Sequence, residues 1–154
     1  MRYLAVVVLI IIYSCNGQKK AAMANTNELK GSSGKLTLIL QDNYSGSEVE
    51  ESMIIKDAKT LKSFYSKVNR TRKPGLPVPE VDFTKEMILI HCIGEQTNGK
   101  TAELTFVQEN ENEVIVKSSI KILEKGKTSS SITSPFSVYK MPLTQKKISF
   151  KKNE

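Results

Sequence analysis

The chain has 154 residues, of which 39% are hydrophobic and 25% charged, and it carries a formal net charge of +7. This length suits one domain with a buried core. The basic residues are scattered and no tryptophan accompanies them, whereas a nucleic-acid-binding protein concentrates basic and aromatic residues on one face. We therefore expect no nucleic-acid partner, and we interpret the charge as favouring solubility and mild attraction to anionic surfaces.

The first fifteen residues combine a charged start, an apolar run and a cysteine. Arg2 precedes the apolar residues 4–12, which fit the roughly 7–15-residue core of a secretory signal but not the about 20 residues of a spanning helix. With Ser14 and Cys15 after it, this run resembles a bacterial lipoprotein signal. The resemblance implies that residues 1–14 are a signal peptide and that acylated Cys15 ties the protein to a membrane of the cell envelope.

Other interpretations of this segment remain open. The commonest lipoprotein box has leucine and alanine or glycine where this chain has Ile12 and Ser14, so the alternatives to acylation are a simple cleaved signal or a weak anchor. The β-branched residues of the run also suit a buried N-terminal strand. Such a strand would not explain why the polar segment 16–34 follows at once.

Residues 15–34 are predicted to form a lipid-anchored flexible linker. The segment is polar, contains Gly31 and Gly34, and shows no sustained period. As a flexible coil it would span on the order of 25 Å, enough to hold a small domain just off a membrane. No acidic stretch resembling a surface-export signal follows the cysteine, so we expect an anchor in the outer membrane that faces the periplasm.

Residues 35–154 are predicted to form a single α+β domain, in which one amphipathic helix packs on a mostly antiparallel β-sheet. Alternating apolar residues predict two early strands with one buried face each. Asp57 is expected to cap the helix by accepting backbone hydrogen bonds. The residues that carry these predictions are Leu36, Leu38 and Leu40 in the first strand, Val49, Met53 and Ile55 in the second, and Leu61, Phe64 and Val68 on the helix.

The second half of the chain is rich in predicted strands. Residues 87–93 are apolar almost throughout, which is typical of a central strand covered on both faces. Four later segments are predicted to be strands, and Pro135 is expected to open the third of them. The inward residues are predicted to be Ala102, Leu104 and Phe106, then Val114, Val116, Ile120 and Ile122, then Phe136 and Val138, and finally Ile148 and Phe150.

Two motifs within residues 56–150 resemble one family. A helix and a proline-rich segment lead to residues 81–85 (VDFTK) and an apolar strand that ends at Gly94, and residues 134–142 (SPFSVYKMP) close the domain. This arrangement is similar to the C-terminal domain of the protease complex subunit PrcB family. Residues 96–100 (QTNGK) depart from the Thr-Gly-Gly-Tyr turn of that family. The resemblance implies a secreted or lipid-anchored accessory domain that associates with a surface protease, and it carries over no catalytic residue.

The sequence offers no convincing catalytic or metal-binding set. His91 is the only histidine and is expected to be a satisfied core residue, while Cys92 is expected to be a small buried hydrophobe on the opposite face of the same strand. Gly126-Lys127-Thr128 lacks the earlier glycine of a phosphate loop. We expect the carboxylate pairs Glu50–Glu51 and Glu109/Glu111 to be solvated, and we predict no cofactor, no metal ion and no enzymatic activity.

Two short segments are candidate binding residues. Arg70 and Arg72 follow the helix and could meet an acidic partner, although cations at this end also favour the helix dipole. Asn98 and Gly99 fit a tight hairpin turn, which is either a plain strand connection or an exposed binding tip. We therefore expect a lipid-anchored, non-enzymatic protein that binds another envelope or secreted protein. The alternative is a protease inhibitor whose loops at 98–99 and 128–131 enter an active-site cleft.

Overall fold

The computed structural model describes residues 35–97, 99–122 and 131–152. The predicted signal peptide, the linker with Cys15, Asn98 and the Gly126-Lys127-Thr128 segment lie outside the described residues.

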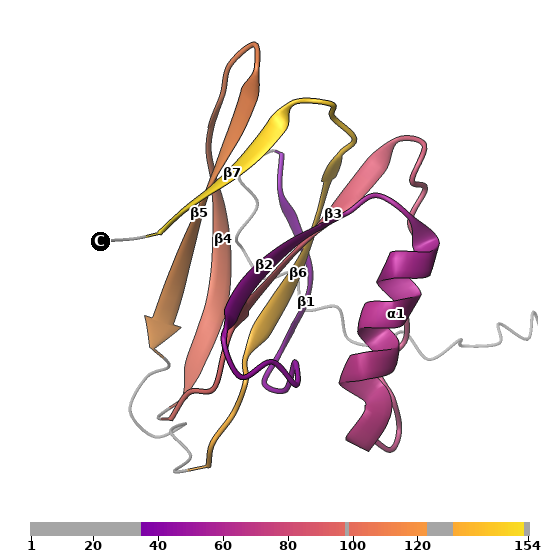
Figure 1. Ribbon diagram of the computed structural model, residues 1–154, viewed down its shortest axis with the longest axis vertical. Coiled ribbons are helices and arrows are strands. Elements are labelled where there is room, and N and C mark those ends of the chain that lie inside the picture. Colours follow the sequence, from indigo (N-terminus) through magenta and orange to yellow (C-terminus); the bar gives the residue numbers. More distant parts are fainter. Residues whose placement is uncertain (1–34, 98, 123–130, 153–154) are drawn as a thin grey trace, which may run out of the picture.

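The described residues form three layers (Figure 1). Helix α1 is the first layer, a four-stranded sheet in the order β1-β6-β3-β2 is the second, and a three-stranded sheet in the order β4-β5-β7 is the third. The elements are β1 (Thr37–Asp42), β2 (Glu50–Ile55), α1 (Ala58–Val68), the 3-10 helix η1 (Asn69–Thr71), β3 (Glu86–Ile93), β4 (Lys100–Glu109), β5 (Glu113–Ile122), β6 (Phe136–Pro142) and β7 (Lys147–Lys152).

The predicted class, a mostly antiparallel α+β fold with one helix, is confirmed for the described residues, but the strands form two sheets rather than one. Every strand pair is antiparallel except β5 with β7, which is parallel. The division arises because β3 and β4 do not pair, so the chain crosses from the first sheet to the second between them.

Strand β3 lies at the centre of the molecule, as the apolar run predicted. It pairs with β2 and β6, and residues 87–93 are all buried. Alternate residues of β3 contribute to two different cores. The helix-side core contains Ile55, Leu61, Phe64, Tyr65, Val68, Ile88, Ile90, Cys92, Phe136 and Val138. The inter-sheet core contains Leu36, Met87, Leu89, Leu104, Val114, Val116, Tyr139, Met141 and Ile148.

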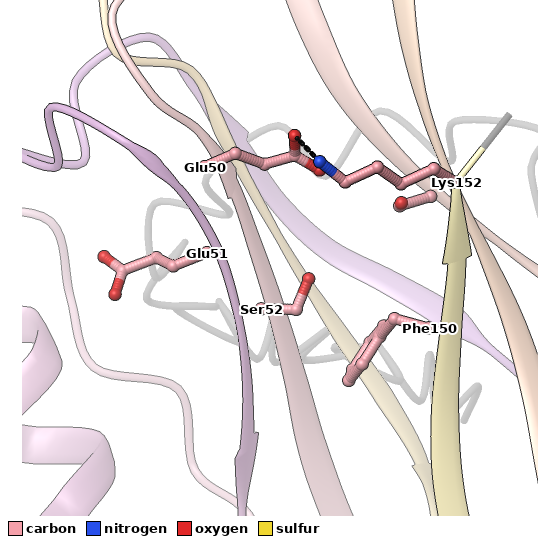
Figure 2. Close-up of a pocket in the computed structure, with 6 residues that line it drawn as sticks. Glu50, Glu51, Ser52, Phe150 and Lys152 are labelled. Carbon is pink, nitrogen blue, oxygen red and sulfur yellow. Dashed lines mark hydrogen bonds and ion pairs between the residues drawn. The ribbon is translucent and has the colours of Figure 1, made fainter. Parts of the chain in front are cut away.

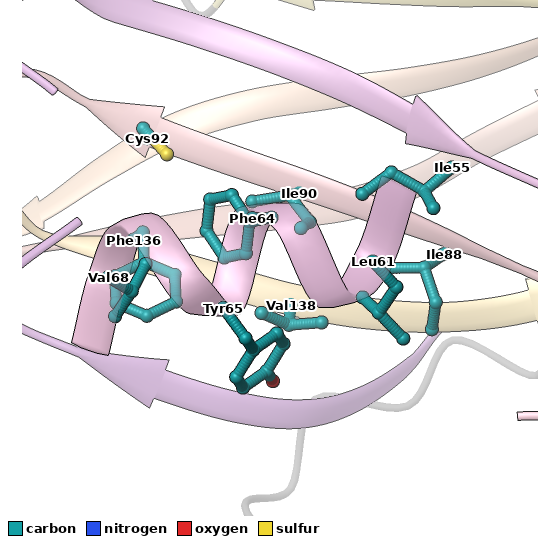
Figure 3. Close-up of a cluster of buried hydrophobic side chains, with 10 residues drawn as sticks. All are labelled: Ile55, Leu61, Phe64, Tyr65, Val68, Ile88, Ile90, Cys92, Phe136 and Val138. Carbon is teal, nitrogen blue, oxygen red and sulfur yellow. The ribbon is translucent and has the colours of Figure 1, made fainter. Parts of the chain in front are cut away.

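The helix begins where the sequence predicted. The side chain of Asp57 accepts a hydrogen bond of 2.8 Å from the backbone N–H of Thr60, which caps the first turn. One side of α1 packs on the four-stranded sheet (Figure 3). Phe64 contacts Phe136 of β6 edge to face, with ring centroids 5.5 Å apart. This geometry is favourable for aromatic rings and fixes the helix over the sheet.

Three predictions of buried faces are wrong. Val49, expected on the buried face of the second strand, is 70% exposed, because it precedes β2 and lies in the loop before it. In β1 the pairing with β6 shifts between Leu38 and Leu40, and the extra residue reverses the alternation. Leu38 therefore packs in the inter-sheet core, whereas Leu40 packs in the helix-side core. In β5, Ile120 and Ile122 are 46% and 68% exposed, because β7 pairs only with the first part of β5 and does not extend over these residues.

Candidate functional site

The two arginines proposed for binding have different surroundings. Arg72 donates to both carboxylate oxygens of Asp42, at 3.0 Å for Nη1 to Oδ2, and to the carbonyl of Tyr44 at 2.9 Å. Its guanidinium also lies 5.9 Å from the centroid of the Tyr44 ring. Arg72 therefore ties the end of the helix to β1, and only Arg70 on η1 presents an exposed guanidinium.

The predicted hairpin at residues 98–99 is wrong, because the strands on either side of it belong to different sheets. Gly99 has a φ of 53°, the positive value that the sequence predicted. Gln96 pairs with Thr133 through reciprocal backbone hydrogen bonds of 2.7 and 2.9 Å. The structure therefore brings together the flanks of the two segments proposed as inhibitory loops, with Ile132 exposed beside them.

A third candidate, which the sequence did not indicate, is a cleft between β2 and β7. Each of these strands lies at the edge of its sheet. The cleft has a volume of about 150 Å³ and is lined by Glu50, Glu51, Ser52, Ser118, Phe150 and Lys152. Figure 2 shows the Ser52 hydroxyl and the Phe150 ring pointing into the space between the sheets, whereas Glu51 points to the other side of β2.

The sandwich is closed on its opposite side. There, Gln41 of β1 donates to the carbonyl of Ala102 in β4 at 2.7 Å. Lys35 pairs with Glu109 at the end of β4 and lies 5.2 Å from the Phe106 ring centroid. The two sheets are therefore joined along β1 and β4 and separate towards β2 and β7.

One ion pair spans the open side. Lys152 of β7 donates to Glu50 of β2 at 2.7 Å (Figure 2). The Lys152 side chain is 74% exposed, and exposed pairs of this kind contribute only about 0–1 kcal/mol. An incoming chain can therefore separate the two charges at little cost.

A row of polar residues runs across the four-stranded sheet behind the cleft. Cross-strand pairing aligns Gln41, Ser137, His91 and Ser52 on neighbouring strands. His91 is 1% exposed, and its Nδ1 lies 3.0 Å from the Ser52 hydroxyl. Burial lowers the pKa of His91, so the imidazole is neutral near pH 7. His91 is thus a hydrogen-bonded core residue, as predicted, and it positions the Ser52 side chain at the cleft wall.

Cys92 faces away from His91, as predicted, and packs in the helix-side core. It is a free cysteine, and burial raises the pKa of its thiol to about 11. A thiol in this state is a poor nucleophile, because the thiolate is the reactive form.

Two lysines hold the Glu109 carboxylate, whose side chain is only 23% exposed, so the prediction that Glu109 is solvated is wrong. Glu109 accepts hydrogen bonds from Lys146, at 2.6 Å, and from Lys35, which together lower its pKa to about 2. Glu109 is therefore ionised at neutral pH and unsuited to act as a general acid. Within residues 35–97, 99–122 and 131–152, no group of three or more histidine, cysteine or acidic residues could hold a metal ion.

One wall of the cleft could be predicted from the sequence. The alternation in β2 places Glu50 and Ser52 on one face and Glu51 and Met53 on the other. The strand opposite them could not be inferred, because β7 reaches this position by pairing in parallel with β5, a strand more than twenty residues earlier in the chain.

Comparison with protein-family models, curated proteins and solved structures gives no match to this chain. Among the described residues, no helix has the length and apolar character needed to cross a membrane.

Proposed function

We propose that this chain is a lipid-anchored, non-enzymatic protein of the bacterial cell envelope whose domain binds another envelope or secreted protein. The signal-like residues 1–14, the cysteine at position 15 and the polar segment after it support the anchor. The resemblance to the PrcB family supports an accessory role for a secreted or surface protease. The anchor would lie in the outer membrane and face the periplasm.

The free edge of β2 beside the cleft is the observation that carries the binding proposal. β2 pairs only with β3, so its other edge offers unpaired backbone donors and acceptors. Extended polypeptides bind such edges by adding a strand. Ile54 is 41% exposed on this edge strand, and the cleft could receive a partner side chain between Ser52 and Phe150. The proposed partner is therefore a protein segment in extended conformation.

The chemistry of the described residues supports a binding role over a catalytic one. The single imidazole is buried and bonded to Ser52, and the single described thiol is buried and protonated. We also infer that α1 is amphipathic, because one side of it buries four residues against the sheet: Leu61, Phe64, Tyr65 and Val68.

Site-specific photo-crosslinking in cells tests the binding proposal. A photoreactive residue at Ile54 is expected to capture a protein partner, because this position lies on the free edge strand. The matched control is the same residue at Thr105, which is exposed on β4 of the other sheet. Equal adducts from both positions, or none from Ile54 under several growth conditions, would count against the proposal.

Mass spectrometry of the mature N-terminus tests the anchor separately. We expect an acylated residue at Cys15, and we expect a Cys15→Ala variant to be released from the membrane fraction. An unmodified Cys15 in membrane-bound protein would overturn the lipid anchor.

A protease inhibitor is the second candidate function. It is favoured by the backbone pairing of Gln96 with Thr133, which brings the flanks of the two proposed loops together. Purified protein added to envelope proteases is expected to slow peptide cleavage if this function is correct. Unchanged rates across the proteases tested would exclude it.

A further inference from the structure

The outward face of α1 carries only cations and small polar residues. Opposite the buried residues of α1 lie Lys59, Lys62, Ser63 and Ser66, and Arg70 follows on η1; all five residues are exposed. The spacing of three and four residues places the four residues of α1 along one stripe, and Arg70 continues it past the end of the helix. The stripe is roughly 16 Å long at the rise of a helix. No aspartate or glutamate occurs between residues 58 and 79.

The cations of this stripe form no close ion pair within the described residues. Two other cations of the segment have partners, since Lys67 pairs with Glu51 at 3.8 Å and Arg72 pairs with Asp42. Lys59, Lys62 and Arg70 form no hydrogen bond or ion pair within the described part of the chain. Lys62 and Arg70 therefore present unshared positive charge to the solvent, while Lys59 also interacts electrostatically with the Asp57 carboxylate at the start of the helix.

We propose that this cationic stripe docks on the anionic lipid headgroups of the membrane that anchors the chain. This inference rests on the proposed lipid anchor. Segment 16–34 can separate Cys15 from Lys35 by at most about 65 Å, so an anchored domain stays within reach of the headgroups. Each cation near an anionic leaflet strengthens binding by about fivefold, so three of them suffice for appreciable contact.

The composition of the stripe favours lipid over an acidic protein. Protein interfaces depend on buried aromatic and apolar anchors, and the stripe Lys59, Lys62, Ser63, Ser66 and Arg70 has none. A purely charged surface instead suits contact with headgroups without insertion into the acyl region. Such contact is sensitive to salt because exposed charges are screened.

Docking in this way would orient the domain. The three-stranded sheet lies on the far side of the molecule from α1 (Figure 1) and would point away from the membrane. The cleft between β2 and β7 lies at the edge of the layers, so it would open sideways and stay accessible to a partner.

Vesicle sedimentation tests the inference on the chain from residue 15 onward with Cys15→Ala, which carries no lipid. At low salt we expect binding to vesicles of phosphatidylcholine with 30% phosphatidylglycerol, and at least tenfold weaker binding to phosphatidylcholine alone. The triple variant Lys59→Glu, Lys62→Glu, Arg70→Glu is expected to lose at least tenfold in affinity. The charge-preserving variant Lys59→Arg, Lys62→Arg, Arg70→Lys is expected to bind like the parent.

The matched control places the same charge change on the opposite layer. Lys121→Glu, Lys147→Glu, Lys151→Glu alters three exposed lysines of β5 and β7, and we expect a loss of less than threefold. An equal loss in both triple variants, with circular dichroism showing both folded, would overturn the inference in favour of net charge alone. No binding of the parent, or capture of an acidic protein through the stripe in place of vesicles, would also overturn it. The Cys15→Ala chain used here carries no lipid. None of these outcomes therefore bears on the mass-spectrometric test of acylation at Cys15.

Discussion

His91 links the stability of the domain to pH through a single buried imidazole. Burial lowers its folded pKa, while the unfolded chain takes up the proton near pH 6.5. Below that pH the unfolded state binds more protons than the folded state, so stability falls as the pH falls. The contribution of His91 to the free energy of unfolding is complete above about pH 6.5. As the pH falls below this value, the contribution declines by at most about 1.4 kcal/mol per pH unit, until the folded imidazole itself takes up a proton.

We expect urea denaturation to show a lower free energy of unfolding at pH 5.5 than at pH 7.5. His91→Gln should remove most of this difference, because glutamine does not titrate. Ser52→Ala keeps the imidazole and should retain the difference. A His91→Gln variant with the parental pH dependence would show that another group is responsible.

Comparing alanine substitutions at Gly46 and Gly94 distinguishes the cost of backbone strain from the cost of a steric clash. Both have a φ of 72°, which costs a residue with a Cβ roughly 1–2 kcal/mol. A Cβ at Gly46 would meet nothing within 4 Å, whereas one at Gly94 would lie 2.8 Å from the carbonyl oxygen of Glu48. We therefore expect Gly46→Ala to cost about 1–2 kcal/mol and Gly94→Ala a further 1–3 kcal/mol, measured by urea denaturation. Equal costs would contradict the close approach of Gly94 to the start of β2.

At the scale of elements, α1 depends on its aromatic contact with the sheet. Phe64 is 7% exposed and contacts both Tyr65 and Phe136 edge to face. Phe64→Ala is expected to lower the free energy of unfolding by about 3–5 kcal/mol, because it leaves a cavity under the helix. The neighbouring Ser63 is exposed, and Ser63→Ala should change stability by less than about 0.5 kcal/mol. Calorimetry or denaturant unfolding distinguishes the two.

The elements differ in how far the sequence predicts them. The central strand β3 and the capped helix could be predicted because each pattern is local: an unbroken apolar run and a capping residue before a buried stripe. The face of Leu40 could not, because a bulge in β1 reverses the alternation and its position depends on the pairing with β6. The exposure of Ile120 and Ile122 at the end of β5 could not be predicted either. Their alternation with polar residues does not indicate how far β7 extends along β5.

Local sequence patterns predict even less of the candidate site than of the fold. His91 could be assigned to the core from its apolar neighbours, and its strand partner Ser52 lies directly opposite it. The cleft requires knowledge of which strands lie at the two sheet edges, and the parallel pairing of β5 with β7 leaves no local pattern in the sequence.

At the scale of the whole molecule, Glu109 joins three distant segments. It accepts hydrogen bonds from Lys35, before β1, and from Lys146, between β6 and β7. The hydrogen bond from Lys146 is the larger cause of its lowered pKa, about 2, and Lys35 is the second. A depressed folded pKa gives stability that is present above the unfolded value, near 4.5, and is lost as the pH falls towards 2.

Glu109→Gln is therefore expected to be less stable than the parent at pH 7, and the difference should shrink as the pH falls from about 4.5 to about 2. Thermal unfolding across this range measures the difference. Glu111→Gln is the control, since Glu111 is exposed and has no ion-pair partner among the described residues. A constant difference between parent and Glu109→Gln at all pH values would contradict the role of its ionisation.

The position of β7 has a practical consequence for the design of fusion proteins. Lys152 is both the last residue of β7 and part of the cleft wall. An affinity tag or reporter attached directly after β7 would lie next to the mouth of the cleft and would compete with any strand that approaches β2. Partner-recovery experiments should therefore insert the tag within residues 16–34, which precede the strand on the closed side of the sandwich.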